Sequence, residues 1–131
     1  MEKVNKVSSG AKWENIVGYS RAIRVGNLIE ISGTASVGEN GELFGDNDPE
    51  SQTRQIIGIA EKALKSLGSG LGDVIRTRIY VTDIGQWEVI GKVHGEYFRE
   101  TKPVTTMVEV SRLITPGMLV EIEFTAWSGS D

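Results

Sequence analysis

The stretch that decides the fold is Pro103–Ala126, which reads PVTTMVEVSRLITPGMLVEIEFTA. It contains two runs, Thr105–Val110 and Met118–Ala126, separated by a loop that includes Pro116-Gly117. Both runs alternate with the period of two that is typical of a strand with one buried face. We therefore expect two strands here. The apolar face of the second one is expected to carry Met118, Val120, Ile122, Phe124 and Ala126.

The other face of this sheet is predicted to be mixed in character. Glu121 and Glu123 are two residues apart, so they point to the same side of a strand. Neighbouring strands add further side chains to this face: Glu30, Arg76, Arg78, Tyr80, Met107, Glu109 and Leu119. Such a face is either solvated, with cross-strand ion pairs, or an interface between subunits. The interface is favoured, because solvated faces seldom expose Met, Leu and Tyr together.

Composition excludes several classes of protein. The chain has 131 residues, no cysteine, one histidine and a net charge of -4. A disulfide framework, a thiolate metal site and a multi-histidine metal site are therefore excluded, and an acidic chain argues against a nucleic-acid partner. No apolar run reaches the length of a signal peptide or a membrane span. We expect a single cytoplasmic domain over residues 1–131, with no membrane association and no metal.

The N-terminal part of the chain predicts an edge strand and a hairpin. Val4–Val7 is short enough for an edge strand, and residues 8–18 are expected to form a loop. Arg21–Val25 and Leu28–Ser32 alternate and are separated only by Gly26-Asn27, which predicts a tight hairpin. Ile29 and Ile31 are expected in the core. Residues 34–47, rich in Gly, Asn and Asp, are expected to form a long loop of the kind that often borders a site.

The first helix has clear boundaries. Asp48 is a capping residue, Pro49 suits the first turn, and Gly68 stops the helix. Its apolar residues recur at helical spacing: Ile56, Ile57, Ala60, Ala63, Leu64 and Leu67.

A strand and a second helix follow. In Val74–Val81, the residues Ile75, Thr77, Ile79 and Val81 are expected on one face. The second helix is expected over about Gly85–Glu100, with Asp83 as its cap. The side chains expected on its packed side are Trp87, Ile90, His94, Tyr97 and Phe98.

This order of elements predicts an α+β fold. Strand–helix–strand units require crossover connections, so part of the sheet must be parallel. Only one face of each strand is uniformly apolar, so both helices should cover the same face. The expected architecture is a two-layer sandwich, with a mixed six-stranded sheet and two helices on one face.

Three segments resemble the RidA/YjgF family of reactive-intermediate deaminases. They are GYSRAIRVGNLIEISGTA, ALKSLGSGLGDVIRTRIYVTDI and PVTTMVEVSRLITPGMLVEIEFTA, which together cover most of the chain in order. The resemblance implies a chorismate-mutase-like fold, a homotrimer, and pockets for a small-molecule ligand in the clefts between subunits. It also implies hydrolysis of enamines and imines such as 2-aminoacrylate, without a cofactor, to ammonia and a keto acid.

The resemblance carries over unevenly to the pocket. Glu121 corresponds to the glutamate that positions water in the family, Tyr19 to a pocket tyrosine, and Gly33 to a backbone contact with the ligand. The arginine with which the family grips a substrate carboxylate is replaced by Thr105, which is followed by Thr106. The pocket asparagine falls at Gly91, and Arg21 stands where the deaminases commonly have glutamine.

Each of these residues also has a structural interpretation. On spacing alone, the role of ion-pair partner to Arg76 or Arg78 is slightly favoured for Glu121, and His94 is more often a packed residue than a catalyst. Arg21 is either a relocated anion clamp or the partner of an acid, in which case the cleft prefers uncharged ligands.

Two functional classes follow for the whole chain. The first is an enamine or imine deaminase with Glu121 as its catalytic residue and Tyr19, Arg21, Gly33, Thr105 and Thr106 as substrate-binding residues. The second is a non-catalytic, metabolite-binding or regulatory trimer. Ribonuclease activity is the weakest interpretation, because the chain is acidic and has no pair of histidines.

Overall fold

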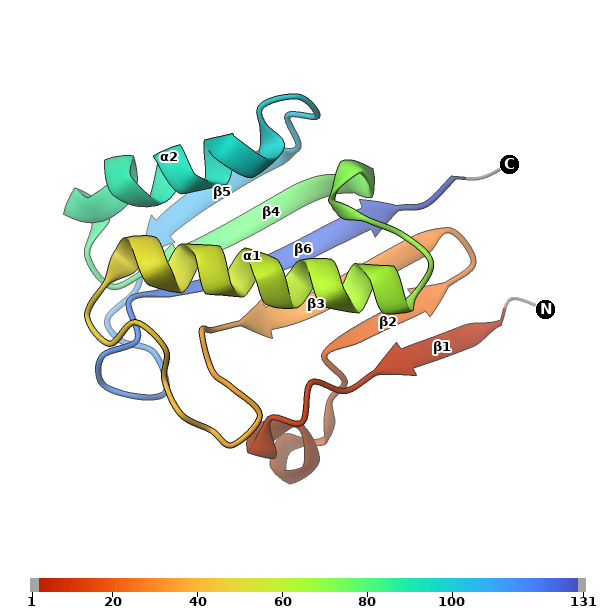
Figure 1. The fold of residues 1–131 in the computed structure, drawn as a ribbon, viewed down its shortest axis with the longest axis horizontal. Helices are drawn as coiled ribbons and strands as arrows, with labels where there is room; N and C mark the ends of the chain where they lie inside the picture. The colour runs from red at the N-terminus through yellow and green to blue at the C-terminus, as the bar shows by residue number, and fades with distance from the viewer. Residues whose placement is uncertain (1–2, 130–131) are drawn as a thin grey trace.

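The computed structural model describes residues 3–129, which form a six-stranded sheet and two α-helices (Figure 1). Two further short helical turns lie at Leu71–Asp73 and Ile84–Gln86. In chain order the main elements are β1 (Val4–Val7), the π-helical turn η1 (Glu14–Gly18), β2 (Ala22–Val25), β3 (Leu28–Thr34), α1 (Pro49–Ser66), β4 (Val74–Val81), α2 (Trp87–Phe98), β5 (Val104–Glu109) and β6 (Val120–Trp127).

The last strand in the sequence lies inside the sheet. The strand order is β1-β2-β3-β6-β4-β5, so β6 joins the N-terminal hairpin to β4. Its pairings with β3 and β4 are antiparallel, whereas β4 and β5 are parallel because α2 connects them as a crossover. The mixed sheet is confirmed, and β1 is the edge strand that was expected.

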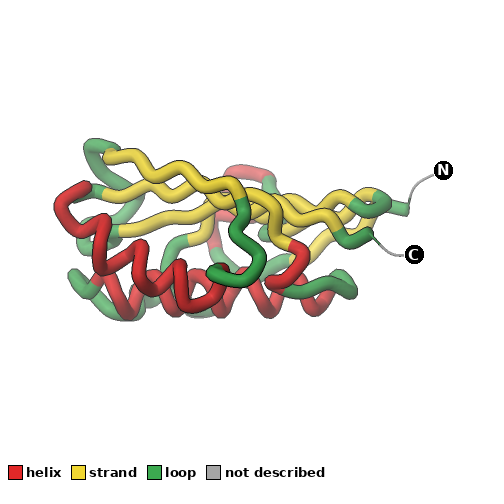
Figure 2. Tube along the Cα trace, turned by 90° about the horizontal axis from the view of Figure 1, so that it is seen from above, coloured by secondary structure: helices red, strands yellow, loops and turns green. Residues whose placement is uncertain are grey.

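Both helices lie against one face of the sheet, as Figure 2 shows. Helix α1 begins where expected, because the Asp48 side chain accepts a hydrogen bond from Ser51 N and Pro49 occupies the first turn. It ends before Gly68, whose φ of 78° is readily adopted only by glycine. The α+β two-layer arrangement is therefore confirmed. Within residues 3–129, no helix combines the length and apolar character needed to cross a membrane.

The core fills the space between sheet and helices. The predicted apolar face of β6 is confirmed, since Ile122 is 0% exposed and Phe124 is 1% exposed. Ile29 and Ile31 of β3 and Ile56, Ile57 and Leu64 of α1 complete the same cluster.

The predicted alternation of β4 is wrong at its start. Val74 is buried, whereas Ile75 is 49% exposed. A bulge between Val74 and Arg76 shifts the register with β6, and an extra residue in one strand reverses the side to which its neighbours point. From Thr77 onward the expected face is buried, with Thr77, Ile79 and Val81 in the core.

The predicted composition of the open face also needs correction on β5. Met107 pairs with Ile79 and Glu109 with Val81, so both lie on the helix side of the sheet. The open face of β5 instead carries Val104, Thr106 and Val108, which pair with the open-face residues of β4. Leu119 precedes β6 and packs partly against the core.

Two helical segments differ from expectation. Helix α2 begins at Trp87, after a short turn in which Asp83 accepts a hydrogen bond from Gly85 N. Trp87 and Tyr97 were expected to pack but are 58% and 39% exposed, and Val93 is buried instead. The segment predicted as a loop before β2 contains the π-helical turn η1, which starts at the buried Glu14.

The bulge in β4 makes a matched stability test possible on a single strand. Ile79→Ala should lower the free energy of unfolding by about 2–5 kcal/mol, because Ile79 is 1% exposed. Ile75→Ala should cost less than about 1 kcal/mol, because Ile75 is largely solvated. Urea denaturation measures both. Equal losses would show that Ile75 is in the core and that the bulge is wrongly placed.

Candidate functional site

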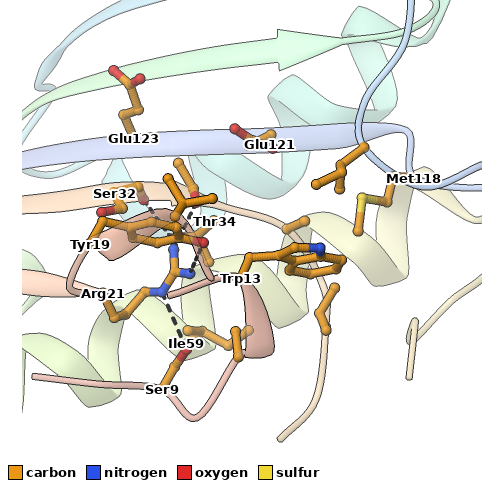
Figure 3. A pocket seen from close by; sticks show the side chains of 16 residues that line it. Ser9, Trp13, Tyr19, Arg21, Ser32, Thr34, Ile59, Met118, Glu121 and Glu123 are labelled. Atoms are coloured by element: carbon orange, nitrogen blue, oxygen red, sulfur yellow. Dashed lines mark hydrogen bonds between the residues drawn. The ribbon is translucent and has the colours of Figure 1, made fainter. Parts of the chain in front are cut away.

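A cavity of about 530 Å³ opens beside an irregularity near the end of β3 (Figure 3). It lies between η1, the starts of β2 and β6, the end of β3, and one residue of α1. The side chains that shape it are Trp13, Val17, Tyr19, Arg21, Thr34, Ile59, Ile114, Met118, Glu121 and Glu123.

Arg21 forms the polar side of the cavity. Its guanidinium is buried and donates to Gly33 O at 2.7 Å, to Thr34 Oγ1 at 3.1 Å and to Ser9 Oγ at 3.3 Å. A fourth hydrogen bond reaches the Tyr19 hydroxyl at 3.4 Å. A guanidinium has five N–H donors, so the protein itself occupies four of them.

Glu14 neutralises this buried cation. Its Oε2 lies 3.6 Å from Arg21 Nε, and it accepts hydrogen bonds from both the backbone N–H and the hydroxyl of Ser9. Burial alone would raise the pKa of Glu14, but the hydrogen bonds from Ser9 and Ser8 and the charge of Arg21 lower it below its ordinary value. Arg21 and Glu14 therefore form a buried ion pair that fixes η1 against β2.

A bulge at the end of β3 brings Glu121 into the cavity. Ile31 and Thr34 pair with β6, and Ser32 and Gly33 between them fall outside the regular register. A Cβ atom at Gly33 would overlap the Glu121 carboxylate, so only glycine allows the two segments to approach this closely. The Gly33 carbonyl is meanwhile held by Arg21.

Of the two acids that line the cavity, Glu121 is the one without an ion-pair partner among residues 3–129. Burial raises its pKa above the ordinary value of 4.5, although the charge of Arg21 acts in the opposite direction. Glu123, two residues later, has a partner, because its Oε1 lies 3.7 Å from Arg78 Nη1. Figure 3 shows the Glu123 carboxylate projecting away from the Arg21 guanidinium. The ion pair predicted between the charged strands is thus Arg78–Glu123.

The remaining walls of the cavity are apolar. Trp13 and Val17 come from the η1 segment, Ile59 from α1, and Ile114 and Met118 from the loop before β6. A cavity with apolar walls and a few convergent polar groups is the usual form of a small-molecule site.

Thr105 and Thr106 lie away from this cavity in the same chain. They belong to β5, and β4 separates that strand from β6. Thr106 pairs with Arg78 on the open face. Thr105 is on the helix face, where its hydroxyl lies 2.8 Å from that of Thr77 and donates to Pro103 O.

His94 is a packed residue on the same side as Thr105. Its Nε2 lies 2.9 Å from Thr77 Oγ1, and its ring stacks at 4.6 Å on Phe98. Burial lowers the pKa of His94, which favours the neutral imidazole.

The structure thus brings together four of the six residues selected from the sequence. Glu121, Tyr19, Arg21 and Gly33 all line the cavity. Sequence reasoning missed Glu14 as the buried partner of Arg21, and it missed Ile59 and Met118 as cavity walls. Glu14 carries no local signal, because its burial depends on the π-helical turn.

Comparison with known proteins identifies the family. Residues 10–128 match the family described as Endoribonuclease L-PSP, which includes the YjgF and RidA proteins. The chain belongs to the YjgF/RidA family. Among curated relatives, SCO2049 of Streptomyces coelicolor is 34% identical, over 98% of this chain and 96% of its own length. The 3-aminoacrylate deaminase RutC of Acinetobacter baylyi is 31% identical, over 79% of this chain and 82% of its own.

Solved structures of YjgF/RidA proteins have the same fold. The crystal structure of Rv2704 from Mycobacterium tuberculosis is 47% identical, with a TM-score of 0.87 over 95% of this chain and 99% of the other. The YjgF protein of E. coli is 27% identical, with a TM-score of 0.81 over 94% and 97%.

The buried Arg21–Glu14 ion pair predicts that replacing Arg21 will strongly lower the stability of the protein. Arg21→Met leaves the Glu14 carboxylate buried without a cation, which should cost about 3–5 kcal/mol of unfolding free energy. Arg54→Met is the matched control, because Arg54 pairs with Glu50 and Glu96 on the surface, where solvent screens the charges, and its loss should cost far less. Urea denaturation compares them, and equal losses would contradict a buried pair.

The raised pKa of Glu121 predicts that this carboxylate lowers stability. A carboxyl with a higher pKa in the folded than in the unfolded state costs stability above that pKa and nothing below the ordinary value of 4.5. Glu121→Gln should therefore raise the urea midpoint at pH 7, and the gain should vanish near pH 4. Glu61→Gln, which removes an exposed partner of Lys65, is the control. A Glu121→Gln protein that is less stable at pH 7 would show that Glu121 has a compensating partner.

Proposed function

We propose that this protein binds a small molecule in the Arg21–Glu121 cavity and hydrolyses enamine or imine compounds there. The observation that carries the proposal is a partly buried carboxylate, Glu121, without an ion-pair partner within residues 3–129, at the wall of a cavity whose other walls are largely apolar. Perturbed acids in clefts are candidate catalytic groups. The kinship with a relative named as a 3-aminoacrylate deaminase supports the same chemistry.

Glu121 has the properties of a general base for this reaction. It removes a proton from a water molecule as the oxygen attacks the carbon of the protonated imine (iminium ion), which gives a neutral carbinolamine. The protonated Glu121 then gives this proton to the carbinolamine nitrogen, and the C–N bond breaks, which releases ammonia. As the carbonyl group forms, the carbinolamine hydroxyl loses its proton to the Glu121 carboxylate. A pKa raised by burial makes the Glu121 carboxylate a stronger base than an ordinary glutamate.

The other polar groups of the cavity would orient the substrate. The Tyr19 hydroxyl accepts from Arg21, which leaves its own proton available to a ligand. Arg21 has one remaining N–H and fixes the Gly33 bulge beside Glu121. We assign Tyr19, Arg21 and Gly33 to substrate binding on this basis.

We further propose that the working form is a homotrimer with pockets between subunits. Thr105 and Glu121 lie on opposite faces of the sheet, so a pocket that uses both must take them from two copies. The open face supports an interface, because its β5 residues Val104 and Val108 are 57% and 42% exposed. The trimer itself is what the family resemblance implies.

Direct assay of imine hydrolysis tests the catalytic proposal. Short-lived imines, including 2-aminoacrylate, are generated in the assay by a pyridoxal-phosphate enzyme or an amine oxidase, and ammonia release is followed. Wild type should accelerate release with at least one imine, and Glu121→Gln should lower the acceleration roughly a hundredfold or more. Glu61→Gln is the control for loss of one negative charge.

Two results would contradict this proposal. Ammonia release by Glu121→Gln at the wild-type rate would remove Glu121 from the chemistry. Binding of ligands without any hydrolysis would favour a metabolite-binding protein instead. Light scattering on the same samples checks the assembly, for which three times the chain mass of 14.3 kDa is expected.

A further inference from the structure

Most of the charged side chains around the cavity form ion pairs, but one carboxylate does not. Arg21 is matched by Glu14, and Glu123 is matched by Arg78. Glu121 remains as a negative charge without an ion-pair partner among residues 3–129. The charged side chains that line the cavity itself are Arg21, Glu121 and Glu123, so the sum of their charges is negative.

Arg21 is poorly placed to offset this negative charge for an anionic ligand. A carboxylate is gripped best by two parallel N–H groups of one guanidinium. Hydrogen bonds to Gly33, Thr34, Ser9 and Tyr19 leave a single N–H of Arg21 for any ligand. Freeing a second donor would break a contact that holds either the bulge or η1.

Thr105 offers no free donor for an anion either. Its hydroxyl has two partners within the protein, Pro103 O at 3.1 Å and Thr77 Oγ1 at 2.8 Å. A threonine hydroxyl carries one proton, and either of these oxygens can accept it. Donation to a ligand would therefore require Thr105 to give up an internal hydrogen bond.

The apolar walls set the rest of the ligand's character. Trp13, Val17, Ile59 and Met118 surround a volume of about 530 Å³, which accommodates a ring or a branched chain. The Trp13 ring already has a cation, because Lys12 Nζ lies 5.4 Å from its centre, so this ring offers an apolar contact rather than a site for the charged nitrogen.

We propose that the cavity selects a cationic nitrogen compound, an amine or an iminium ion, that carries an aromatic or branched apolar group and no carboxylate. Its nitrogen pairs with Glu121, and its apolar group lies against Trp13 and Met118. This inference rests on the proposed function for the identity of the ligand cavity, but not on hydrolysis. A substrate of this class reaches the enzyme as the iminium product of amine oxidation rather than from an amino acid.

Three small molecules of similar shape test which ligand charge the cavity prefers. Benzylamine is a cation, benzoate an anion and benzyl alcohol neutral, and each has one phenyl ring. Isothermal titration calorimetry at neutral pH should give benzylamine an affinity about tenfold or more above that of benzoate. Glu121→Gln should remove most of this preference, whereas Glu61→Gln, on the exposed side of α1, should retain it.

The pH dependence in wild type provides a test that needs no variant. Benzylamine affinity should rise as pH rises through the elevated pKa of Glu121, whereas the affinity of benzyl alcohol should not rise. Arg21, Glu123 and Tyr80 also face Glu121, but an arginine and a tyrosine do not titrate in this range. Glu123→Gln separates the contribution of the second carboxylate, and the benzylamine profile should survive it.

The outcomes distinguish this inference from the catalytic proposal. Benzoate binding as tight as benzylamine binding, or no benzylamine binding at millimolar concentration, overturns the cation preference even if imines are hydrolysed. A benzylamine affinity that is unchanged in Glu121→Gln also overturns it. A strong preference for benzylamine without ammonia release from any imine leaves the inference standing and removes the hydrolase.

Discussion

The buried guanidinium of Arg21 is the constraint on which the site depends. A buried cation is tolerated only when it is paired and its N–H groups find acceptors. Here the acceptors come from the loop before η1, from Tyr19 and from the end of β3. Because one rigid fork joins them, these segments are fixed relative to one another, and Glu14 closes the arrangement from η1.

Fixing the Gly33 bulge has a direct consequence for Glu121. The bulge brings backbone without a side chain against the carboxylate, and together with the cavity walls it leaves Glu121 only partly exposed. The nearest cation, Arg21, is already neutralised by Glu14, so Glu121 stays basic instead of being held as a stable ion pair. The charged form of Glu121 therefore lowers the stability of the folded state, and such local costs are common at functional sites.

The sequence predicted what depends on local patterning. The alternation of β6 and the Asp48-Pro49 start of α1 were read correctly, because each has a local physical cause. The start of β4 failed because a bulge is set by pairing with β6 and leaves no mark on the strand itself. Glu14 was missed for a similar reason, since its burial is decided by Arg21 on another segment. The cavity could be anticipated from Glu121, Tyr19 and Gly33 only through the family resemblance.

The stretch Pro103–Ala126 shows why nearness in sequence misleads about a site. Odd-numbered residues of β5 such as Thr105 and Met107 point to the helices, whereas odd-numbered residues of β6 such as Glu121 point to the open face. The loop between the strands resets the alternation, and β4 then separates them in the sheet. One motif therefore places Thr105 and Glu121 on opposite faces of the sheet. In the proposed trimer, a pocket that uses both residues would take them from two copies of the chain, so the proposed assembly and the proposed site depend on each other.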